Sequence, residues 1–186
     1  RLGGFQIAGS WHPDSGTGNG GTTDFFTQVN DNAQQNNATS IGVNFSRDFQ
    51  GVGIDASAGW GTEDRPGTED PNQYQFSLGA SAAGFSFGGS VAIQDDSSPA
   101  DGESYALGGA YSTGPWTLGV NGILSEVEGN VNNAGDDERL AITGGLDYAL
   151  GPGVTLASGI TYIEFDNEEG NEPSGIAGTL GATVSF

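Results

Sequence analysis

Apolar residues at every second position constrain the fold of this chain more than any motif does. In the segment 175–186, Ile176, Leu180, Ala182 and Val184 share one parity, and small or hydroxyl residues hold the other. A strand with this period has one face against apolar material and one face against a polar phase. The pattern recurs in about ten segments: 2–12, 40–49, 52–61, 73–83, 85–94, 104–113, 116–126, 139–150, 154–165 and 175–186.

The connections between these segments alternate between short and long. Short turns are expected at Gln50-Gly51, around Gly84, at Gly114-Pro115 and at 151–153. Long acidic loops are expected between them, at 13–39, 62–72, 95–103, 127–138 and 166–174. Short turns on one side and long loops on the other are typical of membrane barrels, whose strands give a weak hydropathy signal. We therefore predict an all-β fold, a transmembrane antiparallel up-and-down β-barrel, with periplasmic turns and external loops.

The aromatic residues fall near the ends of the segments and on the apolar parity. Two girdles of this kind anchor a barrel at the two membrane interfaces, because amphipathic rings prefer the depth of the headgroups. The alternative is an ordinary aromatic core of a soluble β-sandwich, which would also place rings in the middle of strands. The interface aromatics that we predict are Trp11, Phe49, Trp60, Tyr74, Phe85, Tyr105, Tyr111, Trp116, Tyr148, Tyr162 and Phe186.

The polar parity consists mainly of Gly, Ala, Ser and Thr. Small barrels fill their interiors with side chains, whereas larger barrels leave an aqueous lumen. Ten strands with such small residues would not fill a closed interior, so we expect one barrel domain, residues 1–186, that lacks its N-terminal strands. Arg1 falls almost inside the first segment, and no Met precedes it. The pore-lining residues that we predict are Gln6, Asn44, Asp48, Asp55, Gln75, Asn121, Arg139 and Asp147.

The charge excludes several classes of partner. The chain has 24 acidic residues against 4 Arg, with a net charge of -20, so nothing could neutralise the phosphates of a nucleic acid. The absence of Cys removes disulfides and thiolate metal sites. Acidic runs such as 136–138 lack the spaced ligands of a dedicated Ca²⁺ loop. We expect no metal site and no cofactor, and an acidic rim that could bridge loosely to lipopolysaccharide through divalent cations.

Three stretches resemble a known family. Residues 1–14 resemble a turn and strand of Gram-negative general porins, and residues 40–60 resemble the next hairpin. Residues 182–186 are similar to the C-terminal signal of the family, which the barrel-assembly machinery reads, and this similarity assigns that role to Phe186. The composition, rich in Gly and Asp without Lys, resembles α-proteobacterial porins. The resemblance implies the last ten strands of a sixteen-stranded barrel, a homotrimer, and the outer membrane with its lipid as surroundings.

Three functions follow from these patterns. The first is a water-filled channel for passive diffusion of small hydrophilic solutes and ions, with mild cation preference because Asp48, Asp55 and Asp147 project inward. The second is an enzyme, with His12, the only histidine, at the rim beside Pro13-Asp14. No nucleophile elbow or two-histidine motif accompanies His12, so we expect no enzymatic activity. The third is a secreted or surface-exposed acidic adhesin or filament module, in which Phe25-Phe26 could anchor a partner or fold the loop back on the rim.

Overall fold

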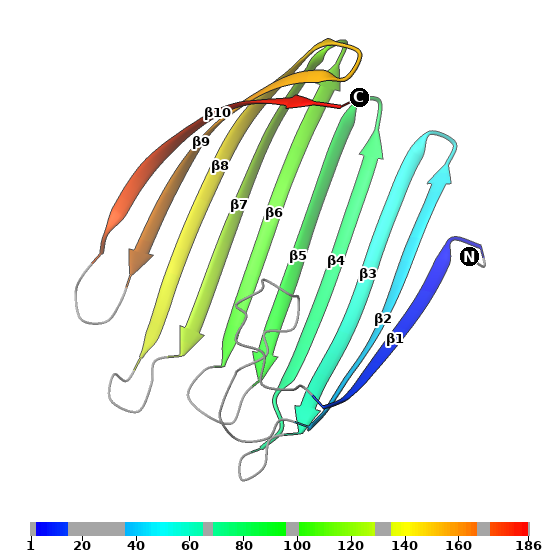
Figure 1. Cartoon of the computed structure of the whole chain (residues 1–186), viewed down its shortest axis with the longest axis vertical. Helices are drawn as coiled ribbons and strands as arrows, with labels where there is room; N and C mark the ends of the chain where they lie inside the picture. Colours follow the sequence, from blue (N-terminus) through cyan, green and yellow to red (C-terminus); the bar gives the residue numbers. More distant parts are fainter. Residues whose placement is uncertain are drawn as a thin grey trace.

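Ten β-strands, joined in chain order, form one antiparallel sheet. The computed structural model describes residues 3–14, 36–64, 69–95, 101–128, 135–166 and 172–185. Figure 1 shows the strands side by side, in the order β1 to β10. Within these ranges, the prediction of an all-β fold with about ten up-and-down strands is confirmed. The strands are β1 (Phe5–Asp14), β2 (Asn36–Phe49), β3 (Val52–Asp64), β4 (Asn72–Ala82), β5 (Phe85–Asp95), β6 (Gly102–Thr113), β7 (Trp116–Glu128), β8 (Asp136–Gly151), β9 (Val154–Asp166) and β10 (Ser174–Val184).

Several strands extend further toward the long connections than the alternation indicates. β2 begins at Asn36 rather than at residue 40, and β8 begins at Asp136 rather than at residue 139. Backbone pairing continues there between acidic residues, as in the pair of Glu128 and Asp136. The ladder needs only backbone N–H and C=O groups, so it persists where apolar side chains have stopped. The first strand begins at Phe5 rather than at residue 2, and the last ends at Val184 rather than at residue 186.

All four predicted short turns lie at one end of the sheet. Gln50 and Gly51 have φ angles of 57° and 89°, and Ala83 and Gly84 have φ angles of 50° and 86°. Two successive residues with positive φ form the turn whose twist matches that of an antiparallel hairpin. Asp48 supports the first of these turns, because its Oδ1 accepts a hydrogen bond of 2.9 Å from the backbone N–H of Gly51.

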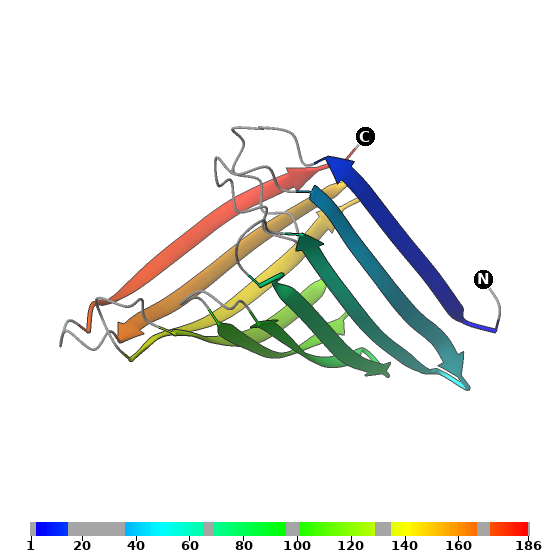
Figure 2. The same cartoon turned by 90° about the horizontal axis from the view of Figure 1, so that it is seen from below.

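The sheet curves into an open trough (Figure 2). Among the described residues, β1 pairs only with β2 and β10 pairs only with β9, so the sheet has two open edges. No hydrophobic side chain in the described ranges is buried. These ranges also contain no helix long and apolar enough to cross a membrane. The organisation of this sheet therefore depends on its two faces rather than on a packed core.

Candidate channel wall

One face of the sheet is polar, and strand register defines it. Gln6 pairs with Asn44, Asn44 pairs with Ser57, and Ser57 pairs with Ser77, so the polar parity stays in phase from strand to strand. We call this the inner face, because a hollow of about 580 Å³ lies on it. The structure places all the predicted pore-lining residues on the inner face, and their role in conduction stays a prediction: Gln6, Asn44, Asp48, Asp55, Gln75, Asn121, Arg139 and Asp147.

Hydroxyl groups form cross-strand pairs along the inner face. The Oγ atoms of Ser57 and Ser77 lie 2.7 Å apart, and the Oγ1 atoms of Thr143 and Thr161 lie 3.0 Å apart. Further pairs of this kind join Ser10 to Ser40, Ser104 to Ser125, and Ser112 to Thr117. A hydroxyl can both donate and accept, so each pair keeps capacity to bind water. The inner face therefore suits contact with an aqueous phase.

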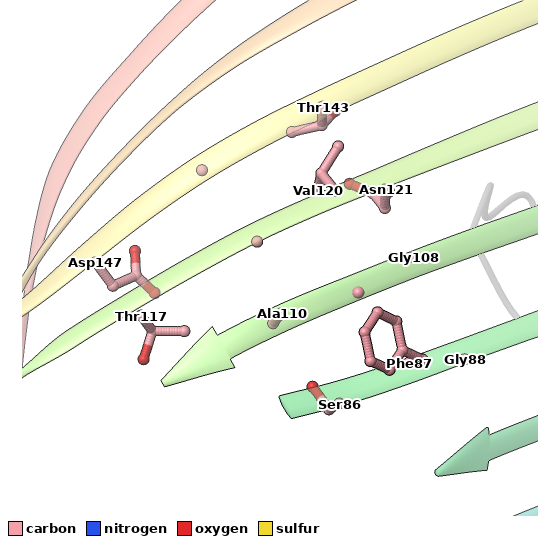
Figure 3. Close-up of a pocket in the computed structure, with 13 residues that line it drawn as sticks. Ser86, Phe87, Gly88, Gly108, Ala110, Thr117, Val120, Asn121, Thr143 and Asp147 are labelled. Atoms are coloured by element: carbon pink, nitrogen blue, oxygen red, sulfur yellow. The ribbon is translucent and has the colours of Figure 1, made fainter. Parts of the chain in front are cut away.

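The hollow lies over β5 to β8, and two of the predicted pore-lining residues line it. Asn121 and Asp147 line it together with Thr117 and Thr143 (Figure 3). Glycines at 88, 108, 119 and 145 complete much of its floor. Because these positions carry no side chain, the wall leaves room for water and small solutes instead of filling its own concavity.

The inner face is acidic. By register it carries Asp137 in addition to the three predicted carboxylates. Glu63 continues the inner-face alternation of β3 beside a register shift with β2, and it is only 8% exposed. Arg139 is the one Arg or Lys on this face within the described residues. Sequence reasoning assigned Glu63 and Asp137 to loops, although their parity continues that of the neighbouring strands. An excess of carboxylates at low-dielectric walls concentrates cations near the surface.

The opposite face, called the outer face here, is apolar and open. Leu107 is 73% exposed and Leu180 is 86% exposed. Exposed apolar side chains that continue from strand to strand across one face indicate contact with another apolar phase. Ten of the predicted interface aromatics have the outer-face parity, whereas Phe186 lies outside the described residues. The ten are Trp11, Phe49, Trp60, Tyr74, Phe85, Tyr105, Tyr111, Trp116, Tyr148 and Tyr162.

Aromatic rings gather on the outer face near the short turns. The ring centroids of Phe85 and Tyr111 lie 4.3 Å apart, as do those of Trp116 and Tyr148. Phe45 and Phe87, which sequence reasoning did not single out, extend this girdle through contacts with Phe49 and Phe85. The parity of Phe45 and Phe87 is the signal that could have found them.

Aromatic residues near the long connections are tied to polar groups. Trp60 Nε1 donates a 3.1 Å hydrogen bond to Asn72 Oδ1, and the Tyr162 hydroxyl donates a 2.7 Å hydrogen bond to Glu164 Oε2. The Tyr105 hydroxyl donates to Glu103. Beyond these rings, a row of directly paired carboxylates crosses four strands of the outer face: Glu103, Glu126, Glu138 and Asp166. Rings with one apolar and one hydrated side are expected at headgroup depth.

Arg47 is a cation on the outer face that sequence reasoning left unassigned. It pairs with Ile54, and its Cζ lies 5.1 Å from the centroid of the Phe49 ring. A long cationic side chain on lipid-facing surface extends toward the interface while its stem stays among apolar groups. The position of Arg47 near the short turns, beside the aromatic girdle, fits this behaviour.

The enzyme candidate His12 lies in β1. Its backbone pairs with Ala38, whereas its side chain lies outside the described part of the structure. Within the described residues, no three His, Asp or Glu side chains are close enough to hold a metal ion. Phe25-Phe26 also lies outside the described residues.

Together, a water-facing inner side, an exposed apolar outer side and two aromatic girdles define the wall of an outer-membrane β-barrel. Residues 1–168 match the profile of the Gram-negative porin family, and the chain belongs to that family. Its location is therefore the Gram-negative outer membrane. The α-proteobacterial type stays a prediction. No curated protein matches the chain.

Two solved structures are similar to the fold. A loop L8 deletion mutant of OmpT, an outer membrane protein of Vibrio cholerae, is similar with a TM-score of 0.57 and 16% identity over 83% of this chain. In-vitro folded OmpT from the same organism is similar with a TM-score of 0.54 and 14% identity over 82% of this chain. The match covers only 55% and 56% of those two chains, so this chain spans about half of their length. At these identities the likeness shows the fold alone.

Proposed function

We propose that this protein forms the wall of a water-filled channel for passive, non-enzymatic diffusion of small hydrophilic solutes and ions, with mild preference for cations. The observation that supports the proposal most is the division of one curved sheet into a hydroxyl-rich, acidic inner face and an exposed apolar outer face. Lining groups of this kind keep a passage wet and set its charge preference without chemistry at a bound substrate.

The open edges support a larger barrel. An edge strand within a bilayer would leave unpaired N–H and C=O groups in hydrocarbon, so membrane sheets close on themselves. We therefore propose that further strands pair with β1 and β10, about six of them if the barrel has the predicted sixteen. Coverage of about half of each similar solved structure agrees with this proposal.

The proposed surroundings of the outer face follow from its chemistry. We propose a homotrimer in contact with membrane lipid, and lipopolysaccharide bridged by divalent cations to carboxylates such as Glu126 and Glu138. Recognition of Phe186 by the barrel-assembly machinery is also a proposal. The adhesin or filament alternative has no supporting observation, because a packed soluble module buries apolar side chains and no hydrophobic side chain in the described ranges is buried.

Ion selectivity tests the proposed channel. In planar bilayers with a salt gradient, the wild-type protein should give discrete conductance steps and a reversal potential of the sign for cation preference. The double variant Asp55→Asn with Asp147→Asn should shift that potential toward zero, because it removes two inner-face charges. Glu103→Gln removes a charge from the outer face and is the matched control, with little expected change. Anion selectivity in the wild type, or an equal effect of the control, would contradict the proposal.

A further inference from the structure

The inner face carries an unusual corner near the long connections, over β7, β8 and β9. We define the Arg139 corner as Ile123, Ser125, Arg139, Ile163 and Phe165. Ser125 pairs with Arg139, and Arg139 pairs with Phe165, so these three side chains lie in one row across the strands. Ile123 and Ile163 lie in the next row toward the short turns, each paired with Ala141.

The guanidinium of Arg139 is held against an aromatic ring. Its Cζ lies 5.5 Å from the centroid of the Phe165 ring. A cation–π contact of this kind restrains the guanidinium without using any of its N–H donors. No carboxylate within the described residues forms an ion pair with Arg139. Ser125 supplies a hydroxyl from the adjacent strand, where its Oγ lies 2.9 Å from that of Ser104.

The apolar residues of the Arg139 corner lie on the inner face, where a purely hydrophilic wall would carry polar side chains. Ile123 is 38% exposed and Phe165 is 44% exposed, although both lie on the inner face. Exposed apolar side chains on a polar face favour a ligand that covers them. The combination of apolar surface with one guanidinium and one hydroxyl complements a molecule that has an apolar body and a single anionic group.

We propose that the Arg139 corner binds small organic carboxylates with an apolar body. The carboxylate accepts hydrogen bonds from the Arg139 guanidinium, and the apolar body lies across Phe165 and the two isoleucines. Asp137, two residues away on the same face, disfavours a polyanion and restricts the carboxylate to the side of Arg139 away from it. The inference rests on the proposed function, in which this face lines a water-filled lumen.

Binding of 4-fluorobenzoate tests the proposal without any conductance measurement. Fluorine NMR of the complete protein in detergent micelles should show saturable broadening of the probe beyond that in empty micelles. Arg139→Gln should weaken the apparent affinity by about tenfold or more, since a hydrogen-bonded charge is lost. Neutral 4-fluorobenzamide should bind the wild type as weakly as 4-fluorobenzoate binds the variant.

Two further variants make the result specific. Arg47→Gln removes a cation from the outer face and should leave binding unchanged. Arg139→Lys keeps the charge but loses the planar fork, so its affinity should lie between those of the wild type and Arg139→Gln. Folding of each variant is checked by its shift in gel mobility on boiling. An equal loss of affinity in Arg47→Gln, or no saturable binding by the wild type, would overturn the proposed binding site. In that case, conductance by the wild type would still support the proposed channel.

Discussion

Leu107→Arg should prevent the protein from inserting stably into a bilayer, whereas Ala106→Arg should be tolerated. Leu107 lies on the outer face of β6 between Tyr105 and Tyr111, at a depth between the two girdles, and is 73% exposed. An arginine on the lipid face costs about 2–4 kcal/mol at the bilayer midplane and less near the interfaces. Ala106 is the adjacent residue in the chain, but it lies on the inner face between Ser90 and Ile123.

The two arginine variants form a matched pair, because they carry the same residue in the same strand. Reversible unfolding in lipid vesicles, followed by tryptophan fluorescence in urea, gives the free energy of unfolding of each. We expect a loss of about 2–4 kcal/mol for Leu107→Arg and a loss well below that for Ala106→Arg. Equal losses would mean that lipid does not contact the outer face.

Gly84→Ala should destabilise the protein strongly for so small a substitution. Gly84 has a φ of 86°, and a Cβ at this position would lie 2.5 Å from the backbone oxygen of Ser112. The Ser112 N–H donates a 2.8 Å hydrogen bond to the Gly84 oxygen, so the two backbones cannot separate without losing it. Left-handed strain costs about 1–2 kcal/mol, and displacement of this bond adds about 1 kcal/mol or more.

Gly51→Ala separates these two contributions. Gly51 has a similar φ of 89°, but a Cβ there would meet nothing within 4 Å. The positive φ therefore strains an alanine in both variants, and only Gly84→Ala also places a Cβ against the backbone of β6. We expect the urea midpoint to fall in both and to fall clearly further in Gly84→Ala. Indistinguishable midpoints would show that β5 and β6 are not held together at this turn.

Much of the fold could be predicted from sequence because side-chain parity and turn residues are local properties. Alternation assigned faces to residues such as Trp60 and Gln75, and Gly84 marked a turn. The ends of the strands could not be predicted, because pairing among acidic residues such as Glu128 and Asp136 depends on backbone groups that are the same in every residue. Residue Phe186 lies outside the described residues, so its predicted role stays a prediction.

The Arg139 corner was harder to predict, because it depends on the register between strands that are distant in the sequence. The predicted outer-face position of Tyr162 puts Ile163 on the inner face, but an isoleucine gives no local signal of a binding surface on a polar wall. Pairing of Arg139 with Phe165 places the cation beside a ring 26 residues away in the chain, which no local pattern indicates. Arg47 has the same parity as Phe45 and Phe49. A single cation in the sequence does not indicate whether its side chain contacts lipid headgroups or an aqueous lumen.

The central claim is that lipid covers one face of the sheet and water covers the other. The chain has no cysteine, so single cysteines for spin labelling can be introduced one at a time along β6 from residue 103 to residue 111. In lipid bilayers, accessibility to oxygen should peak at positions 105, 107, 109 and 111, and accessibility to a water-soluble nickel chelate should peak at 104, 106, 108 and 110. Two accessibility profiles that rise and fall together along the strand would contradict this account.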